Sequence, residues 1–204
     1  VELESIYLIG DFAVRGKLSP REQKPRCVRY EPIFVLTEEK KFSKGDLISD
    51  GYPFFAGRIG LAATLRLVSP EKDEKIFLEL PCLNAVIAKI YVNGKHAGII
   101  SWPPYELEIT NFVHDGDNEI EIELINSLRN LLGPHHRPSG EPSSTWETDF
   151  SGAWSPEERK SYPEWFKSRR EGAAYWTDDY FFVPFGLKGK VKIKYLSVKN
   201  ERRA

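Results

Sequence analysis

Apolar residues recur at every second position along much of this chain, and this alternation limits the folds that are open to it. The stretch 58–68 shows it best, because one face would carry Ile59, Leu61, Ala63, Leu65 and Leu67. Such a period is typical of a half-buried β-strand, in which successive side chains point to opposite faces. The sequence therefore predicts extended structure here instead of an amphipathic helix.

Similar alternation predicts strands along most of the remaining chain. Asn93-Gly94 lies between two of these stretches and favours a type I′ hairpin, in which both central residues have positive φ. A second turn is predicted at 115–118. Pro32 weakens one stretch, because proline has no N–H for a strand ladder. The predicted strands are 5–9, 28–36, 58–68, 76–80, 86–92, 96–100, 105–109, 120–124, 181–185 and 191–195.

Short strands separated by Gly, Pro and Asn turns are typical of an antiparallel sandwich or barrel. The sequence shows neither the strand–helix alternation of a parallel sheet nor an internal repeat. A length of 204 residues fits one large domain or two small ones. We expect a single β-sandwich domain over residues 1–204.

The charge balance argues against two classes of partner. Lys and Arg total 29 against 30 Asp and Glu, which gives a formal net charge of −1. A chain with this balance lacks the positive charge that attracts nucleic acid or an anionic membrane surface. Its apolar runs are also shorter than the roughly 18 residues of a bilayer-spanning helix. We therefore expect neither nucleic acid nor a membrane as a partner.

The two cysteines, Cys27 and Cys82, are too few for a disulfide framework. We expect two buried thiols, with a single bridge as the alternative. Unpaired cysteines lean toward a cytoplasmic location, and the sequence leaves the compartment open.

The sequence contains no methionine and opens on Val1, without the charged and apolar regions of a signal peptide. We therefore expect the chain to be an excerpt of a larger protein.

Residues 133–179 break the period of two and form a predicted insertion. Its first part is rich in Pro, Gly and Ser, and capping patterns that begin at Ser155 and Ser161 predict two short helices, the second ending near Gly172. Four of the five tryptophans lie in it, namely Trp146, Trp154, Trp165 and Trp176. A loop of this length is usually either functional or disordered, and its many aromatic residues argue against disorder.

Common catalytic motifs are missing from the sequence, including the nucleophile elbow, the zinc-protease helix and the phosphate and dinucleotide loops. The histidines and cysteines lack the spacing of a zinc site, so we expect no metal ligands and no cofactor. Paired carboxylates could perform glycosidic acid–base chemistry, although solvated or capping carboxylates are the simpler interpretation. The candidates are Glu141, Glu147, Asp149, Asp178 and Asp179, of which the last two could instead contribute to a structural calcium site.

The aromatic insertion is the strongest functional indication in the sequence. Flat rings can stack on the apolar C–H faces of a sugar while polar neighbours hold its hydroxyl groups. Three interpretations are open: a satellite core under the loop, a protein interface, and a ligand contact. The candidate residues for carbohydrate or interdomain contact are Arg129, Asn130, His135, His136, Trp146, Trp154, Trp165, Tyr175 and Trp176.

Residues 50–130 resemble a known domain family. The resemblance rests on Gly51-Tyr52-Pro53, Val92-Asn93-Gly94-Lys95 with Gly98, Pro104-Tyr105-Glu106, and Gly116-Asp117-Asn118-Glu119 with Asn126. This order is similar to the galactose-binding-like jelly-roll domain that accompanies family-2-type glycoside hydrolases, such as β-galactosidase and β-glucuronidase.

The resemblance implies an all-β fold, an antiparallel jelly-roll β-sandwich that carries the partly helical insertion near 133–179. In that family the jelly roll lies beside a separate catalytic barrel, which holds the acid and nucleophile carboxylates. A barrel needs about 250 residues, so the 204 residues of this sandwich leave no room for one. The insertion is not part of the generic domain, and the family's sugar site is therefore not carried over.

We expect a non-catalytic accessory domain of a larger glycoside hydrolase. It would pack on the catalytic domain of the same polypeptide, bind carbohydrate, or do both. Two alternatives are a stand-alone carbohydrate-binding module with its site on the insertion, and a hydrolase in its own right that uses the loop carboxylates.

Overall fold

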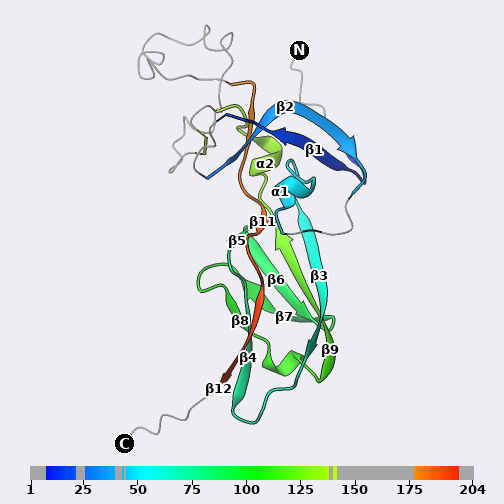
Figure 1. The fold of residues 1–204 in the computed structure, drawn as a ribbon, viewed down its shortest axis with the longest axis vertical. Helices are drawn as coiled ribbons and strands as arrows, with labels where there is room; N and C mark the ends of the chain where they lie inside the picture. Colours follow the sequence, from blue (N-terminus) through cyan, green and yellow to red (C-terminus); the bar gives the residue numbers. More distant parts are fainter. Residues whose placement is uncertain are drawn as a thin grey trace, which may run out of the picture.

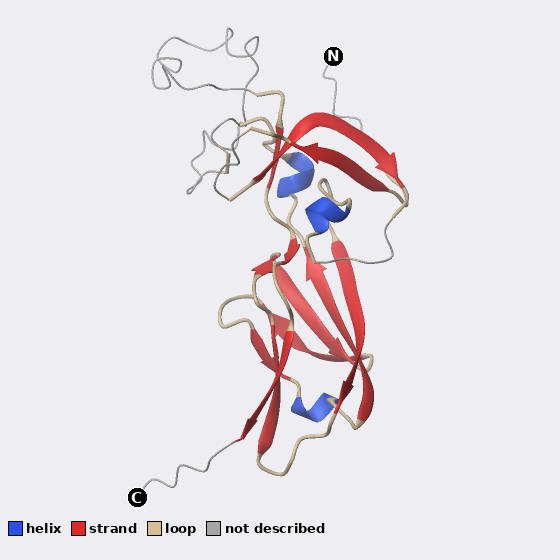
Figure 2. Cartoon of the chain, in the orientation of Figure 1, coloured by secondary structure: helices blue, strands red, loops and turns tan. Residues whose placement is uncertain are grey.

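Antiparallel strands dominate the computed structural model, which describes residues 8–21, 26–39, 43, 45–137, 140–141 and 177–197. Figure 2 shows the strands in red and a few short helices in blue. The predicted all-β sandwich class is confirmed. The helices predicted from residue 155 onwards, and most of the insertion, lie outside the described residues.

Two sheets form a sandwich at one end of the molecule (Figure 1). The first has the order β3-β9-β6-β7, built of Arg58–Leu67, Gly116–Ile125, Ile87–Val92 and Lys95–Ile100. The second has the order β12-β4-β8, built of Lys192–Ser197, Glu74–Glu79 and Glu106–Glu108. In β9 the alternation is realised as predicted, because Ile120, Ile122 and Leu124 are buried between the sheets.

A third sheet, β1-β2-β10, lies at the other end and consists of Ala13–Leu18, Val28–Thr37 and Tyr180–Phe182. Between the two ends, β5 (Leu83–Asn84) pairs with β11 (Gly186–Leu187). The short helices α1 (Leu47–Asp50) and α2 (Arg129–Leu132) lie near this junction (Figure 1), and a 3₁₀ turn, η1, spans Thr110–Phe112. One cluster of buried residues joins the sheets, from Tyr30 and Phe182 at one end to Leu78 and Ile109 at the other.

The predicted hairpin joins β6 to β7. Asn93 and Gly94 have φ of 53° and 73°, as a type I′ turn requires. The predicted turn at 115–118 is partly wrong, because β9 already begins at Gly116, which pairs with Leu67. The side chain of the fully buried Asn118 takes over the loop's hydrogen bonds, accepting from the His114 N–H at 3.0 Å and donating to the His114 carbonyl at 2.8 Å.

Three other expectations need correction. In the described part of the predicted strand 5–9, Leu8 and Ile9 do not belong to a strand, and the first strand among the described residues begins at Ala13. The single strand predicted at 181–185 divides into β10 and β11, because the chain leaves β2 after Phe182 and reaches β5 at Gly186. Cys27 is buried as expected, whereas Cys82 is only half-buried, and the two are thiols instead of a bridge.

Candidate functional site

The two ends of the predicted insertion lie side by side. Phe181 N–H donates to the His135 carbonyl at 2.8 Å, and Thr177 N–H donates to the His136 carbonyl at 3.2 Å. Residues 129–136 and 177–183 therefore form a paired stem at the base of the insertion. The structure brings together four of the predicted site residues on this stem: Arg129, Asn130, His135 and His136.

Asn130 fastens the stem with its side chain. It is 2% exposed. Its Nδ2 donates to the Val183 carbonyl at 2.9 Å, and its Oδ1 accepts from the Val183 N–H at 2.8 Å. The carboxamide thus makes the pair of bonds that a neighbouring strand would make, and it satisfies two backbone groups of a buried segment.

The histidines pack among aromatic rings at the end of the third sheet. The His135 ring lies 5.6 Å from Phe54 and 5.5 Å from Phe182, and the His136 ring lies 4.3 Å from Tyr180. His135 Nε2 donates to the Asn130 carbonyl at 2.8 Å. Burial lowers the pKa of His135 to about 4, against the opposing effect of this hydrogen bond, and burial also lowers the pKa of His136. Both rings are therefore neutral at pH 7.

Three of the candidate carboxylates can be placed. Glu141 accepts from Arg129 Nη2 at 2.6 Å, and both side chains are mostly buried. Asp179 is 5% exposed and accepts from Arg29 Nε at 2.5 Å and from Ser19 Oγ at 3.0 Å. Asp178 is exposed. Two of these acids therefore tie the stem to arginine side chains, which accounts for their position without a reaction.

The remaining candidates lie outside the described residues: Trp146, Trp154, Trp165, Tyr175 and Trp176 for contact, and Glu147 and Asp149 as acids. Carbohydrate or interdomain contact by the candidate residues stays a prediction. Within the described residues, no group of three or more His, Cys, Asp and Glu side chains is placed to hold a metal ion. Of the described helices, none is long and apolar enough to cross a bilayer.

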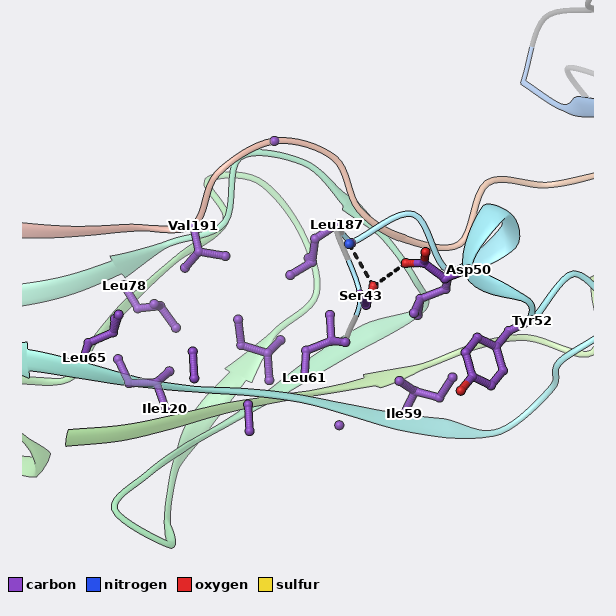
Figure 3. A pocket seen from close by; sticks show the side chains of 17 residues that line it. Ser43, Asp50, Tyr52, Ile59, Leu61, Leu65, Leu78, Ile120, Leu187 and Val191 are labelled. Atoms are coloured by element: carbon purple, nitrogen blue, oxygen red, sulfur yellow. Dashed lines mark hydrogen bonds between the residues drawn. The ribbon is translucent and has the colours of Figure 1, made fainter. Parts of the chain in front are cut away.

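A groove that sequence analysis did not anticipate lies between the edge strands β3 and β12 (Figure 3). It encloses about 450 Å³. Its lining is mostly aliphatic and includes Ile59, Leu61, Leu65, Leu78, Ile120, Ile122, Leu187 and Val191. Figure 3 shows Leu187 and Val191 on one side of the opening and Leu61 and Ile59 on the other. Such a lining favours an apolar occupant.

Hydrogen-bonded polar groups lie at one end of the groove. There Ser43 Oγ lies 2.7 Å from Asp50 Oδ2 and accepts from the Gly45 N–H at 2.8 Å (Figure 3). These groups are paired with each other, and the rest of the lining is mostly aliphatic. Outside that lining, the Tyr195 hydroxyl on β12 donates to the Val68 carbonyl at 2.9 Å and accepts from the Val68 N–H at 3.2 Å, just after β3.

Two exposed apolar features also escaped sequence analysis. The β1–β2 ribbon exposes Ile33 (66%), Val35 (56%) and Leu36 (56%), and Trp102 after β7 is 79% exposed. The alternation of apolar residues did not reveal them. An apolar strand residue fits a period of two whether its face is exposed to solvent or covered by a core. Exposed apolar side chains on a strand ribbon are candidates for contact with another surface.

The fold and the site together define an antiparallel β-sandwich domain with an open apolar groove and an exposed apolar ribbon. No protein-family model matches the chain. Among curated proteins, "Putative beta-glucuronidase" of Formosa agariphila is 27% identical over 161 residues. That match covers 74% of this chain and 13% of the relative, so the chain spans a small part of the curated protein that it matches.

Solved structures give distant likenesses. A rhamnosidase from Novosphingobium sp. PP1Y is 21% identical, with 96% of this chain and 16% of that chain covered and a TM-score of 0.45. A β-glucuronidase of Bifidobacterium dentium is 15% identical, with coverages of 91% and 28% and a TM-score of 0.41. Both matches cover less than a third of the solved chain.

Proposed function

We propose that this chain is a non-catalytic accessory domain of a larger glycoside hydrolase, of the galactose-binding-like jelly-roll type, and that it packs on the catalytic domain of the same polypeptide. The observation that carries the proposal is the unequal coverage of the curated relative. The match takes in 74% of this chain but 13% of a protein named as a β-glucuronidase.

The described carboxylates support a structural role for the chain. Glu141 and Asp179 are held by Arg129 and Arg29. A glycosidase pair instead needs two carboxyl groups that face one sugar from both sides. Hydrolysis would therefore reside in the remainder of the polypeptide.

The exposed ribbon is the surface that we propose for packing on the catalytic domain. Ile33, Val35 and Leu36 lie on the outer part of β2, which Figure 1 shows at the end of the molecule far from β12. Removing such side chains from water is the main driving force of domain association.

Differential scanning calorimetry tests this packing. In the intact polypeptide, the double variant V35D/L36D should give this domain a separate transition at lower temperature. In the isolated chain the same variant should leave the transition temperature nearly unchanged, because both side chains already face water. An intact polypeptide whose unfolding is insensitive to V35D/L36D would contradict the proposal.

Carbohydrate binding is the second candidate function, because Trp102 is 79% exposed and offers a flat apolar face. Isothermal titration of the isolated chain with mono- and oligosaccharides tests it, with W102A as the variant and W102F as the control that keeps a ring. Saturable heat that W102A abolishes supports this role. An absence of heat at millimolar sugar leaves packing as the function.

A further inference from the structure

We propose that an extended segment from the remainder of the polypeptide adds to β3 as a further strand and inserts its apolar side chains into the groove between β3 and β12. This inference rests on the proposed function, since it takes the segment from the larger protein. The segment is defined by its chemistry: a strand with apolar residues at alternate positions on its inner face.

Among the strands that the structure describes, the outer edge of β3 is open. β3 pairs with β9 in an unbroken register from Arg58↔Ile125 to Leu67↔Gly116, and no described strand pairs with its other side. Long unpaired edges are usually blunted by charges, proline or a bulge. Between the flanking Arg58 and Arg66, β3 has none of these.

The backbone hydrogen-bonding pattern identifies the groups on that edge. Asn126 N–H donates to the Gly57 carbonyl at 2.9 Å, one step before the β3–β9 register begins. Because bonded and non-bonded pairs alternate along an antiparallel ladder, the odd-numbered residues of β3 bond to β9. The N–H and C=O groups of Gly60, Ala62 and Thr64 therefore point to the open side, where an added strand would pair with them.

The side chains that face the groove belong to the other set, the odd-numbered residues of β3. Leu61 and Ala63 lie opposite Ile122 and Ile120 and line the groove. Inward side chains of an added strand would continue this face and fill the apolar space of about 450 Å³. Burial of Leu65, Val191 and the ring of Tyr195, which are 36%, 36% and 38% exposed, would follow.

The remainder of the polypeptide is the occupant that the observations favour. The curated relative extends far beyond the matched part, which is 13% of its length. A small apolar ligand would fill the groove but would leave the edge amides of β3 without partners.

Hydrogen exchange with mass spectrometry on peptides that span 58–67 tests the added strand. The amides of Gly60, Ala62 and Thr64 should exchange at least about tenfold more slowly in the intact polypeptide than in the isolated chain. A62P should abolish this protection, because proline removes the N–H at the centre of the open edge. A62S, which keeps the N–H, should retain it.

A second pair of variants tests the groove. A63K places a charge inside it, whereas T64K places the same charge on the outer face, opposite Glu119 and outside the lining of the groove. In the intact polypeptide A63K should remove the protection of the β3 edge and T64K should keep it. The isolated chain should tolerate both, since both positions are exposed there.

The outcomes separate the inference from the proposed function. Protection of the β3 edge that A62P and A63K remove supports the inference. Unchanged exchange at 58–67, in an intact polypeptide that still responds to V35D/L36D in calorimetry, overturns the inference and leaves the proposed function standing. If the intact polypeptide shows neither protection of the β3 edge nor a calorimetric response to V35D/L36D, both the inference and the proposed function are overturned. Protection in the isolated chain at high concentration alone would assign the edge to a second copy and also overturn the inference.

Discussion

Single polar side chains hold the described part of the stem in place by bonding to distant segments of the chain. Asn130 and Val183 are separated by 53 positions in the chain and exchange two hydrogen bonds. Arg29 and Asp179, separated by 150 positions, form a buried ion pair that connects β2 to the residues before β10. At this scale two of the candidate residues, Asn130 and Asp179, bond to other parts of the protein itself.

Replacing Asn130 by alanine should lower the free energy of unfolding by about 2–4 kcal/mol, because the half-buried Val183 loses the hydrogen-bond partners of its N–H and carbonyl. Urea unfolding of the isolated chain measures this. L132A is the matched control on the same short helix, and it should cost no more than about 0.5 kcal/mol, since Leu132 is 60% exposed. Equal effects of the two variants would mean that the carboxamide does not hold the stem.

Stability should depend on pH through His135. Its pKa is about 4 in the folded chain and 6.5 when unperturbed, so the unfolded chain binds the proton more readily. The contribution of His135 to the free energy of unfolding is therefore complete above pH 6.5, and it is lost as the pH falls from 6.5 toward 4. Between pH 7.5 and 5.5 we expect a loss of about 1 kcal/mol from this group.

Urea unfolding of the parent chain and of H135Q at these two pH values checks the assignment. Glutamine keeps a donor for the Asn130 carbonyl but does not titrate, so H135Q should remove the His135 part of the pH dependence and leave the part that the lowered pKa of His136 contributes. A pH dependence as steep in H135Q as in the parent chain would assign it to another group.

Short elements make the junction between the two ends of the molecule, and they depend on backbone contacts that only glycine allows. Gly186 in β11 has φ of 125°, and a Cβ there would lie 1.9 Å from the Gly45 carbonyl oxygen. Gly94 in the hairpin also has positive φ, of 73°, but a Cβ there would meet no atom within 4 Å.

These two glycines therefore make a matched pair. G186A should destabilise the chain by about 3 kcal/mol or more, because backbone atoms must move. G94A should cost about 1 kcal/mol, the price of the left-handed conformation alone. Thermal unfolding monitored by circular dichroism compares them. Similar costs at both positions would show that the close contact of β11 with Gly45 does not form.

The strands of the sandwich could be predicted because each has one buried and one wet face. β9 is the clearest example, with isoleucine and leucine alternating with glutamate. β1 was missed because Gly16 interrupts its alternation, and the space of the missing side chain is taken by the rings of Tyr30 and Phe34. β5 and β11 have two residues each, which is too short for a period to show.

The site could be predicted only in part. The sequence singled out Asn130 and the two histidines but could not show that they bond to 177–183, because pairing across such a separation leaves no local pattern. The groove depends on which strand edges stay unpaired. The order of the strands in each sheet decides which edges are unpaired. The alternation within β3 does not reveal this order, because it is the same whether the outer edge of β3 is open or paired.

For the molecule as a whole, the central claim is that this chain serves a glycoside hydrolase without carrying its catalytic residues. The unequal coverage of the curated relative and the ion-paired carboxylates support it. The exposed ribbon and the groove are the surfaces through which the chain would join the rest of the polypeptide.

Hydrolysis of a panel of aryl glycosides, measured in parallel for the intact polypeptide and for residues 1–204 alone, tests this claim most directly. We predict turnover by the intact polypeptide and none above background by residues 1–204. Turnover by the isolated chain that E147A or D149A abolishes would contradict the claim and make the chain an enzyme in its own right.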